Sequence, residues 1–235
     1  MAQPDSVTQW QLQVVSEHTV HCRQRYFRTK TLFDWCAAAS GLVLLAPVMF
    51  VIALAVRLTS RGPILYRQIR VGINNQPFLI YKFRTMRVDA EKDGAQWARR
   101  NDPRVTPIGR FLRRTHLDEL PQLINVLKGE MSLVGPRPER PIFVSELSRQ
   151  IEGYPLRLAV KPGITGLAQV HHRYDESIED VKVKLHYDLA YVQSCGFGMD
   201  LKIIWNTFWS LLTGRTHDVG APSGATTGAD SAKAA

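Results

Sequence analysis

The chain has 235 residues, of which 45% are hydrophobic and 22% charged, and its formal net charge is +9. This composition excludes a wholly disordered chain and a multi-span membrane protein, and the length suits one domain of moderate size. Three scattered cysteines exclude a disulfide framework and a cysteine-based zinc site, so we expect a reducing compartment. The excess of basic residues predicts an anionic partner: nucleic acid, acidic lipid head groups or a phosphorylated substrate.

The longest apolar stretch extends from Trp35 to Val56 and contains no charged residue. A run of about 20 apolar residues can cross a bilayer as a helix. The polar segment 1–30 precedes the run, which argues against a secretory signal peptide. A buried core helix is the alternative, but the length of the run favours contact with a membrane.

Both flanks of this apolar run are basic, and no Asp or Glu occurs between Asp34 and Asp89. A spanning helix normally carries its basic residues on the cytoplasmic side, where anionic lipid attracts them. Pro47 removes a backbone donor from the middle of the run and disfavours helical geometry at Ala46. We therefore expect a re-entrant helix that breaks at Ala46-Pro47 and returns to the same face; a kinked spanning helix is the alternative.

Composition divides the chain into four parts. Residues 1–30 are polar, residues 31–58 form the expected membrane helix, and residues 59–213 are expected to be the working part of the protein. Residues 214–235 are small and polar, which is typical of a disordered tail.

The working part begins with the pattern of a β-hairpin. Residues 64–72 and 77–86 alternate in character, and Asn74-Asn75 between them suit a turn. Thr106 followed by Pro107 has the pattern of a helix start.

A second helix is expected from about Asp118 to Lys128, with Gly129 as the residue that ends it. The other expected elements are a loop at 132–138, a helix at 142–152, a Pro- and Gly-rich loop leading to a strand at 161–170, a helix at 177–194, and an apolar segment at 200–212 that belongs to the core or to the membrane interface. Together they predict a membrane-associated single domain of the α/β (α+β) class, rich in helices, with a short β-hairpin or sheet and one re-entrant membrane helix.

Asp118 and Glu119, in RRTHLDELPQL, are the first candidates for chemistry. If Asp118 caps the helix, both carboxylates lie at its positive end, where phosphate groups are also attracted. Arg113 and Arg114 nearby would help to keep Asp118 ionised. An ordinary acidic first turn is the alternative for this feature taken alone.

Several arginines stand next to turns, where a stiff backbone would hold them. They are Arg84, Arg113, Arg114, Arg137 and Arg173. A guanidinium group matches phosphate oxygens in a bidentate way, so a set of them favours a phosphate-rich ligand, although each alone could be a solvated surface charge. Gly163 and Gly166 in KPGITG would allow close approach of a ligand to the backbone.

Five segments of the chain occur in the order seen in bacterial sugar transferases. They are LTSRGPILYRQIRVG, YKFRTM, DPRVTPIGRFLRRTHLDELPQLINVLKGEMSLVGPRPE, VKPGITGLAQV and DLKIIWNTF. Over about residues 30–212 the chain resembles the small catalytic form of the monotopic phosphoglycosyl transferases, the undecaprenyl-phosphate sugar-1-phosphate transferases. The LDELPQL and VGPRP segments are highly specific for this family.

The resemblance implies a bacterial enzyme at the cytoplasmic face of the inner membrane, with Ala46-Pro47 at the Ser-Pro-like break of a re-entrant helix. It implies transfer of a sugar-1-phosphate from a UDP-sugar to undecaprenyl phosphate with Mg²⁺, as the first membrane step of glycoconjugate or exopolysaccharide synthesis. UMP would be released. Anionic membrane lipid is a further expected partner, and nucleic acid is not.

The resemblance also assigns roles to individual residues. Asp118 matches the nucleophile, which would carry the covalent phospho-sugar and bind Mg²⁺, and Glu119 is the second catalytic residue. The family's phosphate-binding residues match Lys82, Arg113, Arg137 and Arg173, and Arg84 is added to this set because it stands beside a turn. One departure is His171-His172, where the family has Asn-Gly before the last arginine, and this affects the expected shape of that loop.

The alternative function is a membrane-tethered basic module that binds anionic lipid or nucleic acid. Such a module would account for the charge and the apolar run. It would leave the carboxylate pair among arginines unexplained, and the chain shows no recognised nucleic-acid motif.

Overall fold

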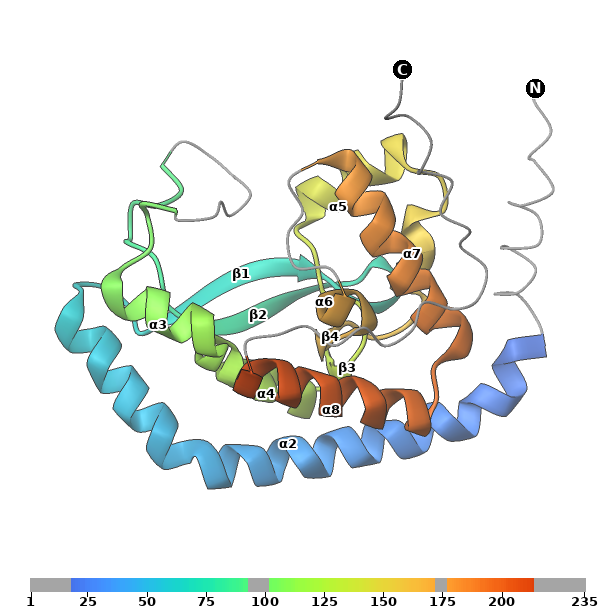
Figure 1. The fold of residues 1–235 in the computed structure, drawn as a ribbon, viewed down its shortest axis with the longest axis horizontal. Coiled ribbons are helices and arrows are strands. Elements are labelled where there is room, and N and C mark those ends of the chain that lie inside the picture. The colour runs from blue at the N-terminus through green and yellow to red at the C-terminus, as the bar shows by residue number, and fades with distance from the viewer. Residues whose placement is uncertain (1–17, 93–101, 172–176, 214–235) are drawn as a thin grey trace, which may run out of the picture.

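The computed structural model describes residues 18–92, 102–171 and 177–213, with side chains from residue 25 onward. Helices dominate this part of the chain, and its strands form two small sheets of two strands each. One long apolar helix, α2 (His18–Thr59), passes beneath the other elements (Figure 1). The expected helix-rich α+β domain with a small sheet and a long apolar N-terminal helix is therefore confirmed.

Helix α2 is long and apolar enough, by length and composition, to cross a membrane over Arg25–Thr59. It continues through Ala46 and Pro47 as one helix, and Figure 1 shows that it is bent rather than straight. A proline inside a helix removes one backbone hydrogen bond and crowds the preceding turn, which accounts for such a bend. The return of the helix to the same membrane face stays a prediction.

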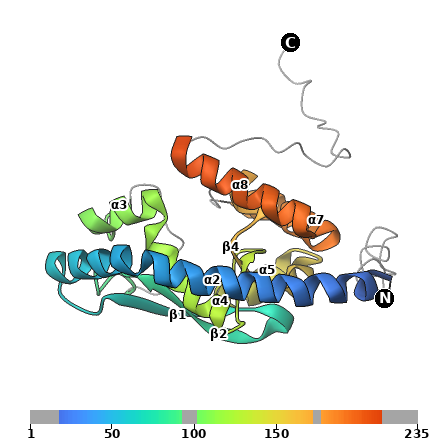
Figure 2. The same ribbon diagram turned by 90° about the horizontal axis from the view of Figure 1, so that it is seen from below.

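Only one side of α2 packs against the rest of the domain. Ala38 and Val56 are fully buried there, whereas Val43 and Leu44 on the other side are each 76% exposed. Seen from below, α2 lies between the β-hairpin on one side and α8 on the other (Figure 2). The exposed apolar side chains are what a helix in contact with hydrocarbon requires.

The expected β-hairpin is confirmed. Strands β1 (Leu65–Val71) and β2 (Pro77–Phe83) pair antiparallel, with Tyr66 opposite Lys82, and the short 3₁₀ helix η1 (Ile73–Asn75) forms the turn. Asn74 and Asn75 have positive φ, which asparagine tolerates better than most residues.

The remaining elements follow in chain order. They are α3 (Pro107–Thr115), η2 (Leu117–Gln122), α4 (Leu123–Leu127), β3 (Ser132–Val134), α5 (Pro141–Gln150), η3 (Tyr154–Ala159), β4 (Gly163–Thr165), α6 (Leu167–His171), α7 (Ile178–Ser194) and α8 (Phe197–Thr213). The predicted start of α3 is confirmed, because Thr106 Oγ1 accepts a hydrogen bond from the Gly109 backbone N–H at 3.0 Å. Helices α5 and α7 are also where the patterns predicted them.

Two expectations for the segments 132–138 and 161–170 are wrong. The first contains strand β3, which pairs in parallel with β4, and the second ends in helix α6 rather than in a strand. Both elements are too short to show a period in the sequence. The β3–β4 pair forms because glycines let the two backbones approach, and α6 begins where the Val170 N–H donates to the Gly166 carbonyl.

Asn125, in α4, joins this helix to the hairpin because its side-chain amide forms hydrogen bonds with the backbone at the edge of β2. Its side chain is fully buried, Oδ1 accepts from the Tyr81 backbone N–H at 3.1 Å, and Nδ2 donates to the Leu79 carbonyl at 2.7 Å. Nδ2 also donates to Glu130 Oε2 at 2.7 Å. The free edge of β2 is thus fixed against the helices that follow it.

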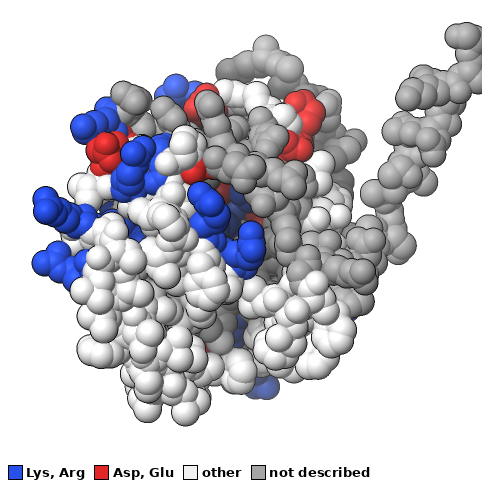
Figure 3. Space-filling view, turned by 60° about the vertical axis from the view of Figure 1, so that its left-hand side comes forward, with Lys and Arg blue, Asp and Glu red and all other residues white. Residues whose placement is uncertain are grey.

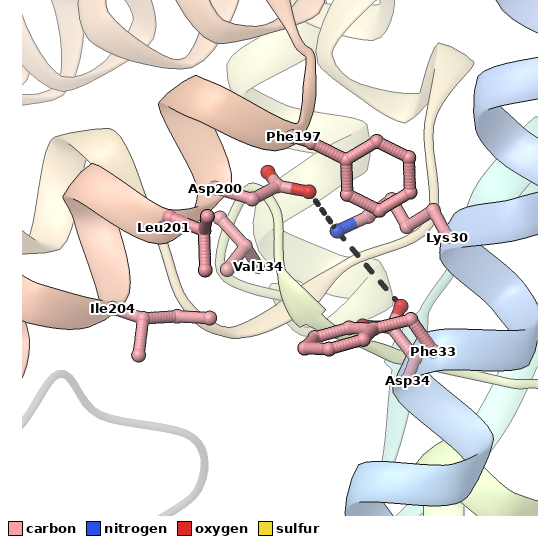
Figure 4. A pocket seen from close by; sticks show the side chains of 8 residues that line it. All are labelled: Lys30, Phe33, Asp34, Val134, Phe197, Asp200, Leu201 and Ile204. Atoms are coloured by element: carbon pink, nitrogen blue, oxygen red, sulfur yellow. Dashed lines mark hydrogen bonds and ion pairs between the residues drawn. The ribbon is translucent and has the colours of Figure 1, made fainter.

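A buried polar cluster joins the start of α2 to α8. Lys30 Nζ lies 2.6 Å from Asp200 Oδ2 and 3.9 Å from Asp34 Oδ2 (Figure 4). Beside this cluster is a cavity of about 90 Å³ whose other walls are apolar side chains such as Phe33 and Leu201. The ion pair between Lys30 and Asp200 joins α2 to α8.

The apolar segment 200–212, expected in the core or at the membrane interface, lies in helix α8 and has one buried and one exposed side. Ile203 is buried in the core, whereas Leu201, Trp205, Phe208 and Leu212 form an exposed stripe at helical spacing. The helix therefore belongs to the core on one side and presents an apolar, aromatic surface on the other. Exposed tryptophan and phenylalanine in such a stripe are typical of helices at a membrane interface.

The role of Asn125 predicts the effect of its replacement. Asn125→Leu keeps the branched shape of the side chain and leaves the Leu79 carbonyl and the Tyr81 N–H without partners, which costs about 1–3 kcal/mol each. We expect the free energy of unfolding, measured in detergent micelles with denaturant, to fall by about 2–5 kcal/mol. The matched control Gln150→Leu, on the exposed side of α5, should change it by less than about 0.5 kcal/mol. A loss of similar size in both variants would contradict this role of Asn125.

Candidate active site

Asp118 and Glu119 lie in the short 3₁₀ helix η2, directly after α3. Helix α3 ends at Thr115 and is capped by His116, which has φ +55° and whose backbone N–H donates to the Leu112 carbonyl. The predicted role of Asp118 as the N-cap of one long helix is wrong: Asp118 lies inside the first turn of η2, and α4 begins only at Leu123. Pro121 explains the split, because it has no N–H to donate to an α-helical bond.

Glu119 is the best-connected acid of the described residues around η2. Its carboxylate is buried and accepts from Lys82 Nζ at 2.9 Å, from Arg137 Nη2 at 2.5 Å and from Arg137 Nη1 at 3.2 Å. Burial alone would raise the pKa of Glu119, but the charges and hydrogen bonds of Arg137 and Lys82 outweigh it and hold the pKa well below its usual value. Glu119 is therefore a permanent anion.

Asp118 is the neighbouring acid and differs from Glu119 in its contacts. Its side chain is also buried, yet its carboxylate makes no hydrogen bond or ion pair with any residue that the structure describes. Burial raises the pKa of Asp118, and the charge of Glu119 adds to this, whereas Lys82, Arg137 and Arg113 oppose it. The site thus holds one carboxylate that is fully paired and one whose oxygens are available.

Three cations from three elements surround this pair of acids. Lys82 comes from β2, Arg113 from the last turn of α3, and Arg137 from the loop after β3. Arg113 is fixed by its Nε, which donates to Thr85 Oγ1 at 2.9 Å. Burial and the nearby Arg137 lower the pKa of Lys82, against the effect of the two carboxylates. The structure therefore brings together five of the predicted site residues.

Two further residues, Arg84 and Arg173, are predicted to bind phosphate, and Arg84 makes its hydrogen bonds elsewhere. The guanidinium group of Arg84 donates to the Ser60 carbonyl at 2.8 Å, to Ser60 Oγ at 2.7 Å and to the Arg61 carbonyl at 2.8 Å. Arg84 thus holds the end of α2 against the hairpin. Arg173 lies outside the described residues, as does His172, while His171 ends α6 and stacks on Tyr187 with ring centroids 4.7 Å apart.

The loop that carries Arg137 is fixed by close backbone packing. The Gly135 N–H donates to the Thr165 carbonyl at 2.9 Å, and the Gly163 N–H donates to the Pro136 carbonyl at 3.0 Å. A Cβ atom on Gly135 would collide with the backbone of Lys161, so only glycine fits. The expectation that Gly163 and Gly166 approach a ligand is wrong: they approach the backbone of Gly135 instead.

Sequence reasoning missed two residues that support this loop, Arg157 and Asp188. A signal was present for Asp188, because Val181, Leu185 and Val192 share its face of α7 at helical spacing and are buried. A carboxylate on the apolar face of a helix indicates a buried partner. No comparable signal marks Arg157.

Asp118 fits the needs of a magnesium ion. No group of three or more His, Cys, Asp or Glu side chains that could hold a metal occurs among the described residues. Magnesium, however, commonly binds through one or two carboxylates together with substrate phosphates and water. The unpaired carboxylate of Asp118 suits that donor set, whereas the oxygens of Glu119 are occupied by Lys82 and Arg137.

The face of the molecule that contains α3 and the second half of α2 has a simple charge pattern. Lys and Arg side chains, with some Asp and Glu among them, gather in its upper part, and the lower part carries almost no charge (Figure 3). Exposed basic residues of this region include Arg57, Arg61, Arg110 and Arg114. An uncharged surface beside a basic band suits hydrocarbon next to anionic head groups.

Comparison with known proteins places the chain among sugar transferases. Residues 25–214 match the profile of the family described as "Bacterial sugar transferase". The N-acetylgalactosaminephosphotransferase of Aeromonas hydrophila, which acts by name on UDP-N-acetylgalactosamine and undecaprenyl phosphate, is 42% identical over 80% of this chain and 45% of its own length. The "UDP-glucose:undecaprenyl-phosphate glucose-1-phosphate transferase" of Klebsiella pneumoniae is 45% identical over 76% of this chain and 39% of its own length.

A shorter relative is matched along nearly all of its length. The "Exopolysaccharide production protein PSS" of Rhizobium leguminosarum bv. phaseoli is 41% identical over 78% of this chain and 95% of its own length. The chain spans less than half the length of the two relatives named before it. These matches give no support to the alternative of a nucleic-acid or lipid-binding module.

The pairing of Glu119 predicts how stability depends on pH. Glu119→Gln leaves the partly buried Lys82 and Arg137 without their counter-charge, so we expect a loss of about 1.5–3 kcal/mol in the free energy of unfolding at pH 7. A carboxyl whose pKa is lowered by folding stabilises the fold above its unfolded pKa of about 4.5 and ceases to do so as the pH falls through its folded pKa. The difference between wild type and variant should therefore be constant from pH 8 to 6 and shrink below about pH 4.5.

The control for this measurement is Glu179→Gln, which removes an exposed ion pair with Lys182. Exposed pairs contribute about 0–1 kcal/mol, so this variant should behave like wild type at every pH. If Glu119→Gln and Glu179→Gln gave the same small difference, the description of Glu119 as a paired structural anion would be wrong.

Proposed function

The chain belongs to the bacterial sugar transferase family, and on this premise we propose that it transfers a sugar-1-phosphate from a UDP-sugar to undecaprenyl phosphate and releases UMP. The names of the relatives support the class of donor and the acceptor. They differ in the sugar, N-acetylgalactosamine in one and glucose in the other, so the proposal is limited to a UDP-linked hexose or N-acetylhexosamine.

The observation that carries the mechanism is the contrast between the two adjacent acids. Glu119 is fully engaged by Lys82 and Arg137, whereas the carboxylate of Asp118 has no partner among the described residues although three cations lie around it. An unpaired carboxylate in a cationic setting is suited to attack a phosphorus atom of a diphosphate. We assign the nucleophile to Asp118 and a structural role to Glu119.

In the first half-reaction an Asp118 carboxylate oxygen attacks the sugar-bearing phosphorus of the UDP-sugar. A bond forms between that oxygen and phosphorus, and the bond from phosphorus to the oxygen that bridges the two phosphates breaks. UMP leaves with the bridging oxygen and its electron pair. The sugar phosphate remains on Asp118 as an acyl phosphate.

In the second half-reaction a phosphate oxygen of undecaprenyl phosphate attacks the same phosphorus. The bond to Asp118 breaks, the carboxylate is restored, and the product is undecaprenyl diphosphate sugar. Two steps allow a water-soluble donor and a lipid acceptor to use one site in turn, without binding at the same time.

The cations of the site overcome the repulsion between the carboxylate and the diphosphate. Lys82, Arg113 and Arg137 are held by side-chain contacts before any substrate arrives, so their charges need little reorganisation as negative charge moves to the leaving UMP. Arg173 is proposed to join them from the segment after α6. The raised pKa of Asp118 implies that activity falls on the acid side at a higher pH than for an ordinary aspartate.

Magnesium is part of the proposal. Asp118 would hold it together with the diphosphate of the donor, and the ion would offset negative charge on the phosphate oxygens. The cations of the chain remain in place around the same phosphates.

The membrane is proposed to be the bacterial inner membrane, with the site on its cytoplasmic face. The apolar side of α2, the exposed stripe of α8 and the basic band above them support contact with hydrocarbon and with anionic lipid. The re-entrant path of α2, with its bend at Pro47, would bring both ends of the helix to the cytoplasmic face.

The assignment of Asp118 is tested by Asp118→Asn. This variant keeps the shape of the side chain and removes the anionic nucleophile, so transfer from a UDP-sugar to undecaprenyl phosphate should fall by at least about 10³-fold with the melting temperature unchanged or higher. The matched control is Asp89→Asn, on an exposed part of the chain, which should retain wild-type turnover. Turnover within tenfold of wild type in Asp118→Asn would remove this residue from the chemistry.

Removal of divalent cations tests the magnesium proposal. Dialysis against EDTA should abolish transfer, because one unpaired carboxylate and the diphosphate would then face each other without the ion. Adding Mg²⁺ should restore the activity, and the melting temperature without substrate should change little, since no described cluster of acids needs the ion to fold. Full activity in EDTA would contradict the proposal.

The re-entrant path is tested by the side of the membrane on which each end of α2 lies. Single cysteines at Arg25 and Arg61, both exposed, are placed in a chain whose Cys22, Cys36 and Cys195 are replaced by serine. Both should resist a membrane-impermeant thiol reagent in intact cells and react after the inner membrane is opened. Labelling of one position alone from the periplasm would instead establish a spanning helix.

A further inference from the structure

The loop that carries Arg137 packs against the buried ion pair of Arg157 and Asp188, which takes no part in the proposed chemistry. Arg157 in η3 and Asp188 in α7 are each no more than 2% exposed. Arg157 Nε and Nη2 lie 2.8 and 2.7 Å from Asp188 Oδ2. Arg157 Nη2 also donates to the backbone carbonyl of Arg137 at 2.8 Å. One guanidinium group therefore joins the interior of the domain to the backbone of a site residue.

The same loop is held from a second element. Arg70 Nη1, on β1, donates to the Pro138 carbonyl at 3.0 Å, and the next residue, Glu139, accepts from Lys184 Nζ at 2.7 Å. Consecutive carbonyls of this loop are thus each bound by an arginine. Such contacts leave the peptide units little freedom to rotate.

Stability alone is a poor explanation for the buried pair. Removing an arginine and a carboxylate from water costs several kcal/mol per ion, and apolar residues of similar volume often stabilise a fold as well or better. The pair does have a geometric consequence, because the planar fork of Arg157 meets Asp188 and the Arg137 carbonyl together. A lysine could satisfy only one of them well.

We infer that Arg157 is a positioning residue for Arg137, held in its orientation by Asp188. It fixes the backbone of Arg137 so that the guanidinium group meets Glu119 and faces the phosphates beside Asp118. This inference rests on the proposed function and extends it to residues outside the site. Displacement of a charged group by about 1 Å can cost on the order of 10²-fold in rate, so the backbone contact matters for catalysis.

A double-mutant cycle separates positioning from a general structural role. Arg157→Lys keeps the charge beside Asp188 and loses the second hydrogen bond, so we expect kcat/KM for the UDP-sugar to fall about tenfold or more. Arg137→Ala should lower it at least as much. If Arg157 acts through Arg137, adding Arg157→Lys to Arg137→Ala should change kcat/KM by less than about twofold.

Two further variants keep the test independent of folding. Arg157→Met with Asp188→Leu replaces the whole pair by apolar side chains, and it should retain the wild-type melting temperature within a few degrees while losing activity like Arg157→Lys. Lys182→Met, on the exposed side of α7, is the control and should leave kcat/KM unchanged. All rates are expressed per folded protein, determined by size-exclusion chromatography in detergent.

The possible results are distinct. Effects of Arg157→Lys and Arg137→Ala that multiply in the double variant would overturn the inference, as would wild-type kcat/KM in Arg157→Lys or in the apolar double replacement. A wild-type protein that is inactive on both UDP-hexoses and UDP-N-acetylhexosamines with undecaprenyl phosphate would instead refute the proposed function. If the wild-type enzyme is active, the double-mutant cycle tests only whether Arg157 acts through Arg137. Its result does not depend on which residue is the nucleophile.

Discussion

The buried carboxylate of Glu119 joins three parts of the chain that are far apart in sequence, because it accepts hydrogen bonds from Lys82 on β2 and from Arg137 on the loop after β3. A buried anion requires partners, and both of these cations also take part in the proposed reaction. The hairpin, fixed by Asn125, supplies Lys82, and the loop after β3, fixed by Arg157, supplies Arg137.

This arrangement separates the roles of two acids that are neighbours in sequence. Glu119 neutralises part of the charge of Lys82 and Arg137 and fixes their direction, whereas Asp118 keeps its oxygens unpaired among the described residues. Two unpaired carboxylates would repel each other and an incoming diphosphate, and two paired ones would leave no nucleophile. The site requires one of each, and the adjacent pair in η2 provides both.

Much of the fold could be predicted because its signals are local. The apolar run, the hairpin and the Thr106-Pro107 helix start follow from composition, alternation and capping. The β3–β4 pair and the target of the KPGITG glycines depend on contacts between distant segments. The split of the second helix has a local cause in Pro121, which the prediction of one long helix does not take into account. For the site, residue type and motif indicated the acids and most of their cations, but only the structure separates Arg84 from the group and adds Arg157.

The most direct test of the covalent mechanism is the mass of the protein after reaction with donor alone. Wild-type protein is incubated with UDP-glucose or UDP-N-acetylgalactosamine and Mg²⁺ without undecaprenyl phosphate, quenched, and analysed by peptide mass spectrometry with UMP measured in parallel. With the donor that the enzyme accepts, the account predicts about one UMP per active site and a sugar-phosphate adduct on the peptide at Asp118. An adduct on Glu119, or UMP that appears only when undecaprenyl phosphate is present, would contradict it.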